Sequence, residues 1–295
     1  MIKPKTEELE VFLAVVDSGG FSAAANQLEM QVAKVSRLVA SLEQKVGANL
    51  LHRTTRRVEP TQEGVAYANT VRAGLLLITE AQERLSSQKD LPVGRLRVDA
   101  ASTVMTHQLV PLVKGFQTQY PGIELELATH ENIIDLVEKR TDVAIRVGSL
   151  KNSNLHARML GRSPLKLVAS PEYLEQFGEP TNAAELLQHK FIGFAGQAHL
   201  NKWPLFGGAL EPEFSNVATS GEVVRQLCIA GMGITLLSQF TVGKDIATGR
   251  LVSLCDGDIE TPHPRELVQA VYYRNSSISP RIKVFLDYIE SRLKL

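Results

Sequence analysis

The side chains best suited to chemistry in this sequence are cations that gather in a short stretch near its start. Between positions 34 and 57 the chain carries six basic residues and one acid, although its 32 basic and 32 acidic residues cancel overall. The six are Lys34, Arg37, Lys45, Arg53, Arg56 and Arg57. Lysine and arginine bind phosphate oxygens, so this local excess of positive charge favours contact with a nucleic-acid backbone. A basic surface that contacts only water is the alternative.

A pair of short helices is expected to position these cations. Residues 22–28 begin with Ser22 after two glycines, and a serine there accepts the free N–H groups of a helix start. Residues 32–46 place apolar side chains at steps of three and four, which buries one face of a second helix and leaves the other for a partner. The apolar face is Val32, Val35, Val39, Leu42 and Val46, and the partner face is Lys34, Ser36, Arg37, Ser41, Gln44 and Lys45. Gly47 ends the helix.

A basic hairpin follows the second helix. Residues 50–58 predict a short strand, a turn and a second strand, whose arginines can reach phosphates on either side of a groove. Helices and hairpin in this order predict a winged helix-turn-helix, which places one helix in a DNA groove. DNA contact is therefore the leading interpretation. We assign it to Ser22, Gln31, Ala33, Lys34, Ser36, Arg37, Arg53, Thr54, Arg56 and Arg57.

A long helix is predicted after the hairpin. Residues 61–87 carry a seam of side chains at alternating steps of three and four, a pattern typical of helices that pair. At ~1.5 Å per residue such a helix spans roughly 40 Å. The seam could pack against the chain's own domain or against a second copy, and we favour the second because helix-turn-helix proteins usually read two half-sites. The seam consists of Ala68, Val71, Leu75, Ile78 and Leu85, with Gln82 between the last two.

Strands and helices alternate beyond a hinge expected at residues 88–94. Strands are predicted at residues 95–101, 123–129 and 142–148, with helices at 103–120 and 133–139. A second block has strands at 165–169, 191–194 and 233–238 and helices at 171–177 and 222–230, and the chain closes with a strand at 267–274 and a helix at 280–293. This alternation predicts a mainly parallel sheet covered by helices.

The ends of these strands are the expected ligand site, because ligands of such sheets lie beyond the carboxyl ends of the strands. Residues 101–103, 129–130 and 146–148 occupy such ends. Ser102 and Thr103 start a helix, whose unpaired N–H groups favour an anion, and Arg146 could hold a carboxylate through two hydrogen bonds. The alternatives are that Ser102 only caps its helix and that Arg146 pairs with a nearby acid.

Other chemistry is weakly indicated. The sequence offers no acid–base set or activated nucleophile for catalysis, and its seven histidines lack the spacing of metal ligands. Cys228 and Cys255 fit buried, reduced thiols, and Trp203 fits a core position. With no apolar run of membrane-spanning length and no leader-like start, we expect a cytoplasmic protein without catalytic residues, metal or membrane contact.

The N-terminal signature of the LysR-type transcriptional regulators resembles residues 20–64, GFSAAANQLEMQVAKVSRLVASLEQKVGANLLHRTTRRVEPTQEG, and the rest of the chain has the matching length and layout. The family usually has a serine where Gln31 stands, and Gln-Ser or Gln-Pro at Val32-Ala33. The matching positions are Phe21, Ala24, Ala25, Leu28, Ser36, Arg37, Leu42, Glu43, Gly47, Leu51, Arg53, Arg57, Thr61 and Gly64.

The resemblance implies a two-lobed C-terminal domain like a periplasmic binding protein, in which the last strand and helix return to the first block. It also implies an inducer cleft between the lobes, which adds candidates from the second lobe. The implied effector-binding residues are Ser102, Thr103, Thr129, His130, Arg146, Phe194, Ala195 and Thr219, with Ser220 beside the last.

Together these observations predict an α/β two-lobed effector-binding domain preceded by an all-α winged helix-turn-helix domain and a long linker helix. The expected boundaries are 1–60, 61–87 and 88–295, with lobe I at about 91–165 and 267–295 and lobe II at about 166–266. We expect a sequence-specific transcriptional regulator modulated by a small-molecule effector, with no other cofactor. The expected partners are double-stranded operator DNA, further copies in a homodimer or dimer of dimers, and RNA polymerase if the protein is an activator.

Three other classes are weaker alternatives. A solute-binding module of periplasmic-binding type, without a gene-regulatory role, would carry a leader peptide and no basic N-terminal domain. An enzyme built on the two lobes would need the acid–base or nucleophile set that the sequence lacks. A DNA-organising protein without an effector would leave the lobes without a role.

Overall fold

The computed structural model of the chain describes residues 3–53, 58–86, 92–131, 136, 141–149, 155–273 and 279–295. The chain divides into two compact units, Met1–Leu85 and Ser86–Leu295. The predicted helix at 133–139, the turn of the hairpin and most of the predicted hinge fall outside the described residues.

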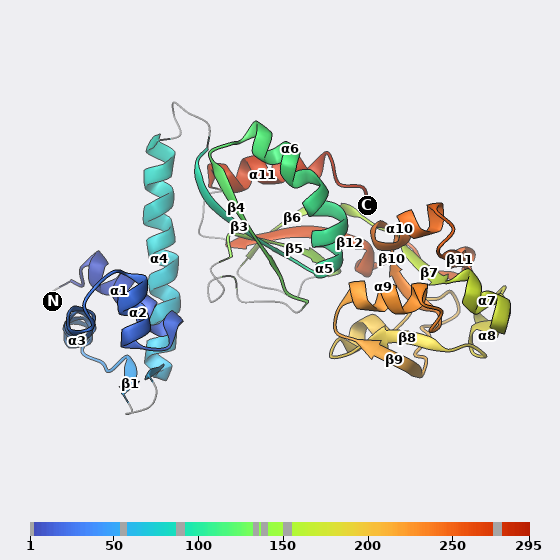
Figure 1. Cartoon of the computed structure of the whole chain (residues 1–295), viewed down its shortest axis with the longest axis horizontal. Coiled ribbons are helices and arrows are strands. Elements are labelled where there is room, and N and C mark those ends of the chain that lie inside the picture. Colours follow the sequence, from blue (N-terminus) through green and yellow to red (C-terminus); the bar gives the residue numbers. More distant parts are fainter. Residues whose placement is uncertain are drawn as a thin grey trace. The chain divides into compact units, whose positions relative to one another are not determined.

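The N-terminal unit is a set of helices with one small hairpin (Figure 1). Its elements are α1 (Thr6–Ser18), α2 (Phe21–Gln27), α3 (Val32–Val46), β1 (Leu51–Arg53), β2 (Val58–Pro60) and α4 (Gln62–Ser86). Gly47 ends α3 with a φ of +72°, a left-handed conformation that glycine adopts without strain. β1 and β2 pair antiparallel, which confirms the two predicted strands, while the turn between them lies outside the described residues.

The core of this unit confirms most of the predicted apolar face of α3. Val35, Val39 and Leu42 are fully buried, and Ala24 of α2 is small enough to let these helices cross closely. Val32 was assigned to the same face and is 45% exposed, because it is the first residue of α3 and precedes the buried stripe by one turn.

A buried carboxylate joins α1 to α3. Glu8 accepts hydrogen bonds from Lys45 Nζ at 2.5 Å, from Ser41 Oγ at 2.7 Å and from the backbone N–H of Lys5 at 2.7 Å. The prediction that Ser41 and Lys45 face a partner is therefore wrong, since both side chains are used to hold α1 against α3. The bond from Lys45, followed by that from Lys5, lowers the pKa of Glu8 to about 2.

The first half of α4 belongs to the same core. Ala68 and Val71 are buried against it and Leu75 is partly buried, so this half of the seam packs within its own unit, the alternative that the sequence left open. Farther along α4, Leu77 and Ile78 are 42% and 52% exposed. The side chain of Leu85 lies outside the described residues.

The C-terminal unit contains two lobes, and we call lobe I the part built on the five-stranded sheet. The strand order is β4 (Ile123–Thr129), β3 (Gly94–Ala100), β5 (Val143–Val147), β12 (Leu267–Tyr273) and β6 (Leu155–Arg162). Its helices are α5 (Ser102–Val104), the π-helical turn η1 (Met105–Leu109), α6 (Val110–Gln119) and α11 (Pro280–Glu290). Phe116 of α6 meets Phe285 of α11 edge to face, so the last helix returns to lobe I as predicted (Figure 1).

Lobe II is the part of the chain between β6 and β12, the two strands of lobe I from which the chain leaves and into which it returns. β7 (Leu165–Ala169) lies between β10 (Thr235–Ser238) and β11 (Val252–Leu254), and β8 (Phe191–Phe194) pairs with β9 (Phe214–Ala218). The helices are α7 (Pro171–Phe177), α8 (Ala183–Leu186), α9 (Gly221–Ile229) and α10 (Gln239–Ala247), with short turns η2 (Ala198–Asn201), η3 (Asp256–Asp258) and η4 (Pro264–Glu266). Trp203 is buried against Phe191 and Phe214, which confirms its core position.

The prediction of a mainly parallel sheet is wrong. β3 pairs in parallel with β4 and β5, but β12 runs antiparallel to both of its neighbours, β5 and β6. β7 likewise runs antiparallel to β10 and β11. The chain passes from lobe I to lobe II after β6 and returns into β12, and the returning strand enters the sheet in the opposite direction. The sequence pattern also failed to indicate β6, β9, β11, α8 and α10.

Glu8→Gln tests the ionic contact between α1 and α3. We expect the free energy of unfolding of this variant at pH 7 to be about 1 to 3 kcal/mol lower than that of the wild type, the range for hydrogen bonds to charged groups. The folded pKa of Glu8 lies near 2, below its usual value of 4.5, so the stabilisation is complete above about 4.5 and disappears as the pH falls toward 2. Urea unfolding followed by far-UV circular dichroism measures it, because the single tryptophan, Trp203, reports the other unit.

Glu10→Gln is the matched control, since Glu10 is exposed on the same helix. An equal loss of stability in both variants, or a difference that persists to pH 2, would contradict the role given to Glu8.

Candidate functional site

The outer face of α3 is the candidate DNA-contacting surface. Gln31, Ala33, Lys34 and Arg37 are exposed, and Ser36 is half-buried. Lys34 Nζ lies 2.7 Å from Glu7 Oε1 in a pair whose side chains are 48% and 46% exposed, and Arg37 Nε donates to its own helix at Ala33 O, at 3.2 Å. Exposed pairs of this kind contribute little free energy, so Lys34 can exchange Glu7 for a phosphate or a base.

Within the described residues, no side chain caps the N-terminal end of α3. Gln31 occupies the N-cap position and its side chain makes no capping hydrogen bond there. Ser22 is exposed in the first turn of α2, and the prediction that it caps this helix is wrong, because α2 begins at Phe21 with Gly20 at the N-cap and no side-chain cap. The side chain of Arg53 and all of Thr54, Arg56 and Arg57 lie outside the described residues, so their contact with DNA stays a prediction.

Three neighbouring strand ends of lobe I converge on one buried carboxylate. Asp99 of β3 is fully buried and lies 2.5 Å from Arg146 Nη2 of β5 through Oδ1. Its other oxygen lies 2.5 Å from Nδ1 of His130, which follows β4. Arg146 therefore pairs with a nearby acid, as in the alternative interpretation, and its guanidinium is largely neutralised. An aspartate between Val98 and the two alanines at 100–101 of the predicted strand is the signal that could have identified Asp99.

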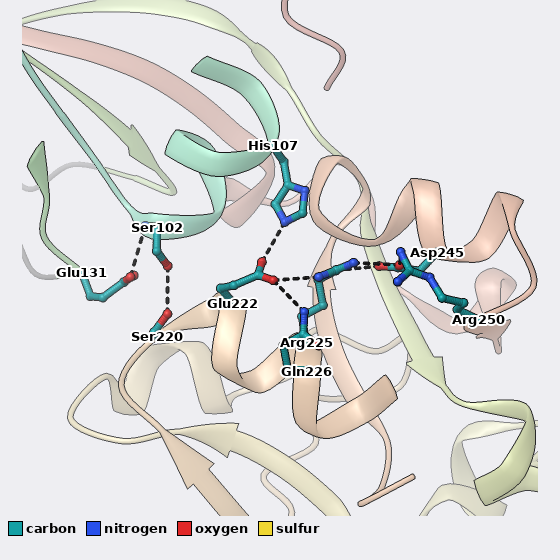
Figure 2. A network of polar contacts seen from close by, with 9 residues as sticks. All are labelled: Ser102, His107, Glu131, Ser220, Glu222, Arg225, Gln226, Asp245 and Arg250. Carbon is teal, nitrogen blue, oxygen red and sulfur yellow. Dashed lines mark hydrogen bonds and ion pairs between the residues drawn. The ribbon is translucent and has the colours of Figure 1, made fainter. Parts of the chain in front are cut away.

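The N-terminal end of the helix at Ser102 already contacts a carboxylate of the chain itself, that of Glu131. The backbone N–H of Ser102 donates to Glu131 Oε1 at 3.1 Å (Figure 2). The Ser102 hydroxyl lies 2.9 Å from the Ser220 hydroxyl of lobe II. Ser102 therefore joins the two lobes, and its N–H has an internal acceptor.

Two further contacts bring α5 and η1 of lobe I against the start of α9. A Cβ at position 221 would lie 3.0 Å from Thr103 Cγ2, so Gly221 permits a close approach that another residue would hinder. His107 Nε2 lies 2.7 Å from Glu222 Oε2 (Figure 2). Neither His107 nor Glu222 is indicated by the sequence, although an acid in the first turn of a helix suits the helix dipole.

Glu222 is held in place from within lobe II. It accepts hydrogen bonds from Arg225 at 2.7 Å and from Gln226 at 3.0 Å, and Arg225 forms two bonds of 2.6 and 2.8 Å with the fully buried Asp245 (Figure 2). Burial acts to raise the pKa of Glu222, but the hydrogen bonds from Gln226 and His107 and the nearby charges lower it below its usual range. Glu222 is therefore a carboxylate at neutral pH, ready to accept from His107.

A cavity of about 360 Å³ lies between the lobes, within the usual size range of small-molecule sites. Of the predicted effector residues, Thr103, Arg146 and Phe194 line it, whereas Ser102, Thr129, His130, Ala195 and Thr219 do not. Its wall is largely apolar, and the sequence missed most of it, including Leu165, Leu236, Phe240, Glu131, Thr241 and Arg265.

Other candidate chemistry stays weak within the part of the chain that the structure describes. Cys228 is buried, and burial raises the pKa of its thiol to about 12, which makes it a poor nucleophile. No three His, Cys, Asp or Glu side chains of the described residues gather into a possible metal site. None of the described helices combines the length and the apolar composition needed to cross a membrane.

Asp99→Asn tests the buried cluster at the strand ends. Removing the charge leaves the Arg146 guanidinium without its counter-ion, and breaking a buried ion pair in this way costs about 3 to 5 kcal/mol. We expect a loss of this size in urea unfolding followed by Trp203 fluorescence. Glu211→Gln is the control, because Glu211 and its partner Lys202 are 61% and 60% exposed and should contribute less than about 1 kcal/mol. Equal, small losses would show that Asp99 does not carry the charge of Arg146.

Comparison with known proteins agrees with this geometry. The HTH-type transcriptional regulator CrgA of Neisseria meningitidis serogroup C (strain 8013) is 41% identical over 298 residues, which cover 99% of this chain and 98% of that protein. A solved structure of CrgA from Neisseria meningitidis superposes with a TM-score of 0.66 at 39% identity, covering 99% of this chain and all of that one. The full-length structure of the Vibrio cholerae virulence activator AphB gives a TM-score of 0.62 at 26% identity, covering 98% and 100%.

Two family descriptions account for nearly the whole length of the chain. Residues 6–65 match "Bacterial regulatory helix-turn-helix protein, lysR family", and residues 89–294 match "LysR substrate binding domain". The resemblance drawn from residues 20–64 is thereby confirmed. The chain belongs to the LysR family of transcriptional regulators, with an N-terminal helix-turn-helix domain and a C-terminal effector-binding domain.

Proposed function

We propose that this regulator reads operator DNA with the outer face of α3 and that a small molecule in the cavity between the lobes modulates that binding. The observation that carries the proposal is the cavity itself. Its lining residues come from both lobes, so one ligand can contact both at once. A ligand that binds one lobe arrangement better than another shifts the population of the two.

The exposed residues of α3 divide by their expected roles. Gln31 and Lys34, near the start of the helix, are proposed to contact base edges, because the first turns of a recognition helix enter the major groove. Arg37 and the hairpin residues Arg53, Thr54, Arg56 and Arg57 are proposed to contact phosphates. Ser22, Ala33 and Ser36 complete the proposed surface.

The proposal also covers the domain boundaries, the cellular location and a further partner. The division of the chain near residue 86 supports an effector-binding domain that is separate from the N-terminal unit. The boundaries that we propose are 1–60 for the DNA-binding domain, 61–87 for the linker helix and 88–295 for the effector-binding domain. We place the protein in the cytoplasm, where its DNA target lies, and infer that it has no catalytic activity. RNA polymerase is the further partner if the protein is an activator.

Lys34→Ala and Arg56→Ala separate base reading from phosphate contact. Genomic fragments bound by the wild type are selected first, and their affinities are then measured by fluorescence anisotropy at several salt concentrations. Arg56→Ala should weaken every fragment alike and reduce the salt slope by about 0.9, the value for one phosphate. Lys34→Ala should instead change the order in which fragments are preferred.

Lys114→Ala is the control for charge, because Lys114 is exposed on α6 of the other unit. The assignment of α3 fails if Lys34→Ala keeps the wild-type order of fragments. The proposed function fails if the wild type selects no preferred fragment at all.

Leu77→Glu combined with Ile78→Glu tests association through α4. Both side chains are exposed in the single chain, and a contact with a second copy would bury them. Burying a carboxylate costs several kcal/mol, so the double variant should sediment as a folded monomer at concentrations where the wild type is a dimer. Leu187→Glu, which changes a 65% exposed leucine of lobe II, should leave the dimer intact. A dimer unchanged in the double variant would place the interface elsewhere.

A further inference from the structure

Two groups are expected to hold an effector anion, the Arg146 guanidinium and the helix start at Ser102. Both already contact acidic side chains of the chain itself. Arg146 lines the cavity, but its guanidinium is paired with Asp99, and the carboxylate of Asp99 is fully buried beside it. The N–H of Ser102 at the helix start donates to Glu131, which also lines the cavity. A ligand anion at either position would have to displace an acid of the chain or approach a negative charge.

Arg265 is another cation that lines the cavity, and its surroundings differ from those of Arg146. It lies in η4, the segment through which the chain returns from lobe II to β12 of lobe I. Its Nη1 donates to the carbonyl of Lys202 at 3.1 Å, and within the described residues no carboxylate forms an ion pair with it. Partial burial lowers the pKa of its guanidinium to about 10, as expected for a desolvated cation without a counter-charge, and leaves it charged at neutral pH.

The rest of the wall limits what can bind beside this cation. Leu165, Leu236, Phe194 and Phe240 present apolar surface, which favours a hydrocarbon or aromatic body. Glu131 repels a second acidic group. The volume of about 360 Å³ suits a small molecule.

We propose that Arg265 binds the acidic group of the effector, and that the effector is a small monocarboxylate with an apolar body. An arginine can hold a carboxylate through two parallel hydrogen bonds, and a partly desolvated cation gains from it the counter-ion that none of the described residues supplies. The assignment rests on the proposed function, since it takes the cavity between the lobes as the effector site.

Matched acids and amides test the assignment on the full-length protein. The probes are benzoate, 3-phenylpropionate and hexanoate, each compared with its neutral amide by isothermal titration calorimetry. For at least one pair the acid should bind wild type tenfold or more tightly than the amide. Arg265→Gln should remove this preference and leave the affinity for the amide unchanged. Arg292→Gln, which makes the same charge change at an exposed residue just after α11, should keep the preference.

A second variant keeps the test decisive if Arg265→Gln does not fold. Glu131→Gln removes the repelling charge, so it should bind adipate, the dicarboxylate related to hexanoate, several-fold more tightly than the wild type does. The inference is overturned if no acid is preferred over its amide in the wild type, if the preference survives Arg265→Gln, or if Glu131→Gln leaves adipate binding unchanged.

Binding of the selected genomic fragments by the same proteins separates this inference from the proposed function. If the wild type binds preferred fragments but shows no acid preference, only the role of Arg265 fails. If it binds no preferred fragment, the proposed function fails as well.

Discussion

The contact between the start of α9 and the helical run α5–η1 is the interaction on which the cavity depends. Only two chain crossings connect the lobes covalently, so their arrangement is fixed by what they touch. Ser102 meets Ser220, and His107 meets Glu222, while Gly221 between them lets the backbones approach. The buried Arg225–Asp245 pair holds Glu222 in place, because Arg225 donates hydrogen bonds to both carboxylates. The cavity is therefore walled by two lobes that already hold each other through hydrogen bonds.

The fold was largely predictable because most of its elements are periodic. Val35, Val39 and Leu42 recur at helical spacing and are buried, and the strand at 165–169, apolar except for Lys166, is β7. The failures have physical causes. β6 mixes exposed and half-buried positions irregularly, with Leu160 alone buried and no apolar run, so it gives no strong strand signal. Strand direction depends on where the chain crosses between lobes, and periodicity carries no information about that.

The candidate site was less predictable, because the sequence shows which residues are charged but not which of them form ion pairs with each other. Lys45 is drawn inward by Glu8, and Arg146 is neutralised by Asp99, partners 37 and 47 positions away in sequence. Arg265 gives no pattern at all, since it stands in a polar turn among prolines. Only the three-dimensional arrangement shows that it lines a largely apolar cavity and that no carboxylate of the described residues pairs with it. Recognising a ligand-binding cation thus requires knowing its neighbours, which are distant in the chain.

The position of Arg265 also constrains how an effector could act. The contacts between α5–η1 and α9 already join the lobes, and an effector that bound every lobe arrangement equally would shift nothing. A bound carboxylate at Arg265 would act on the returning crossing itself, because η4 leads directly into β12 and Arg265 is tied to the Lys202 carbonyl of lobe II. The ligand's charge would thereby act on one of the two chain crossings between the lobes, where a small change in backbone angle moves one lobe as a body against the other.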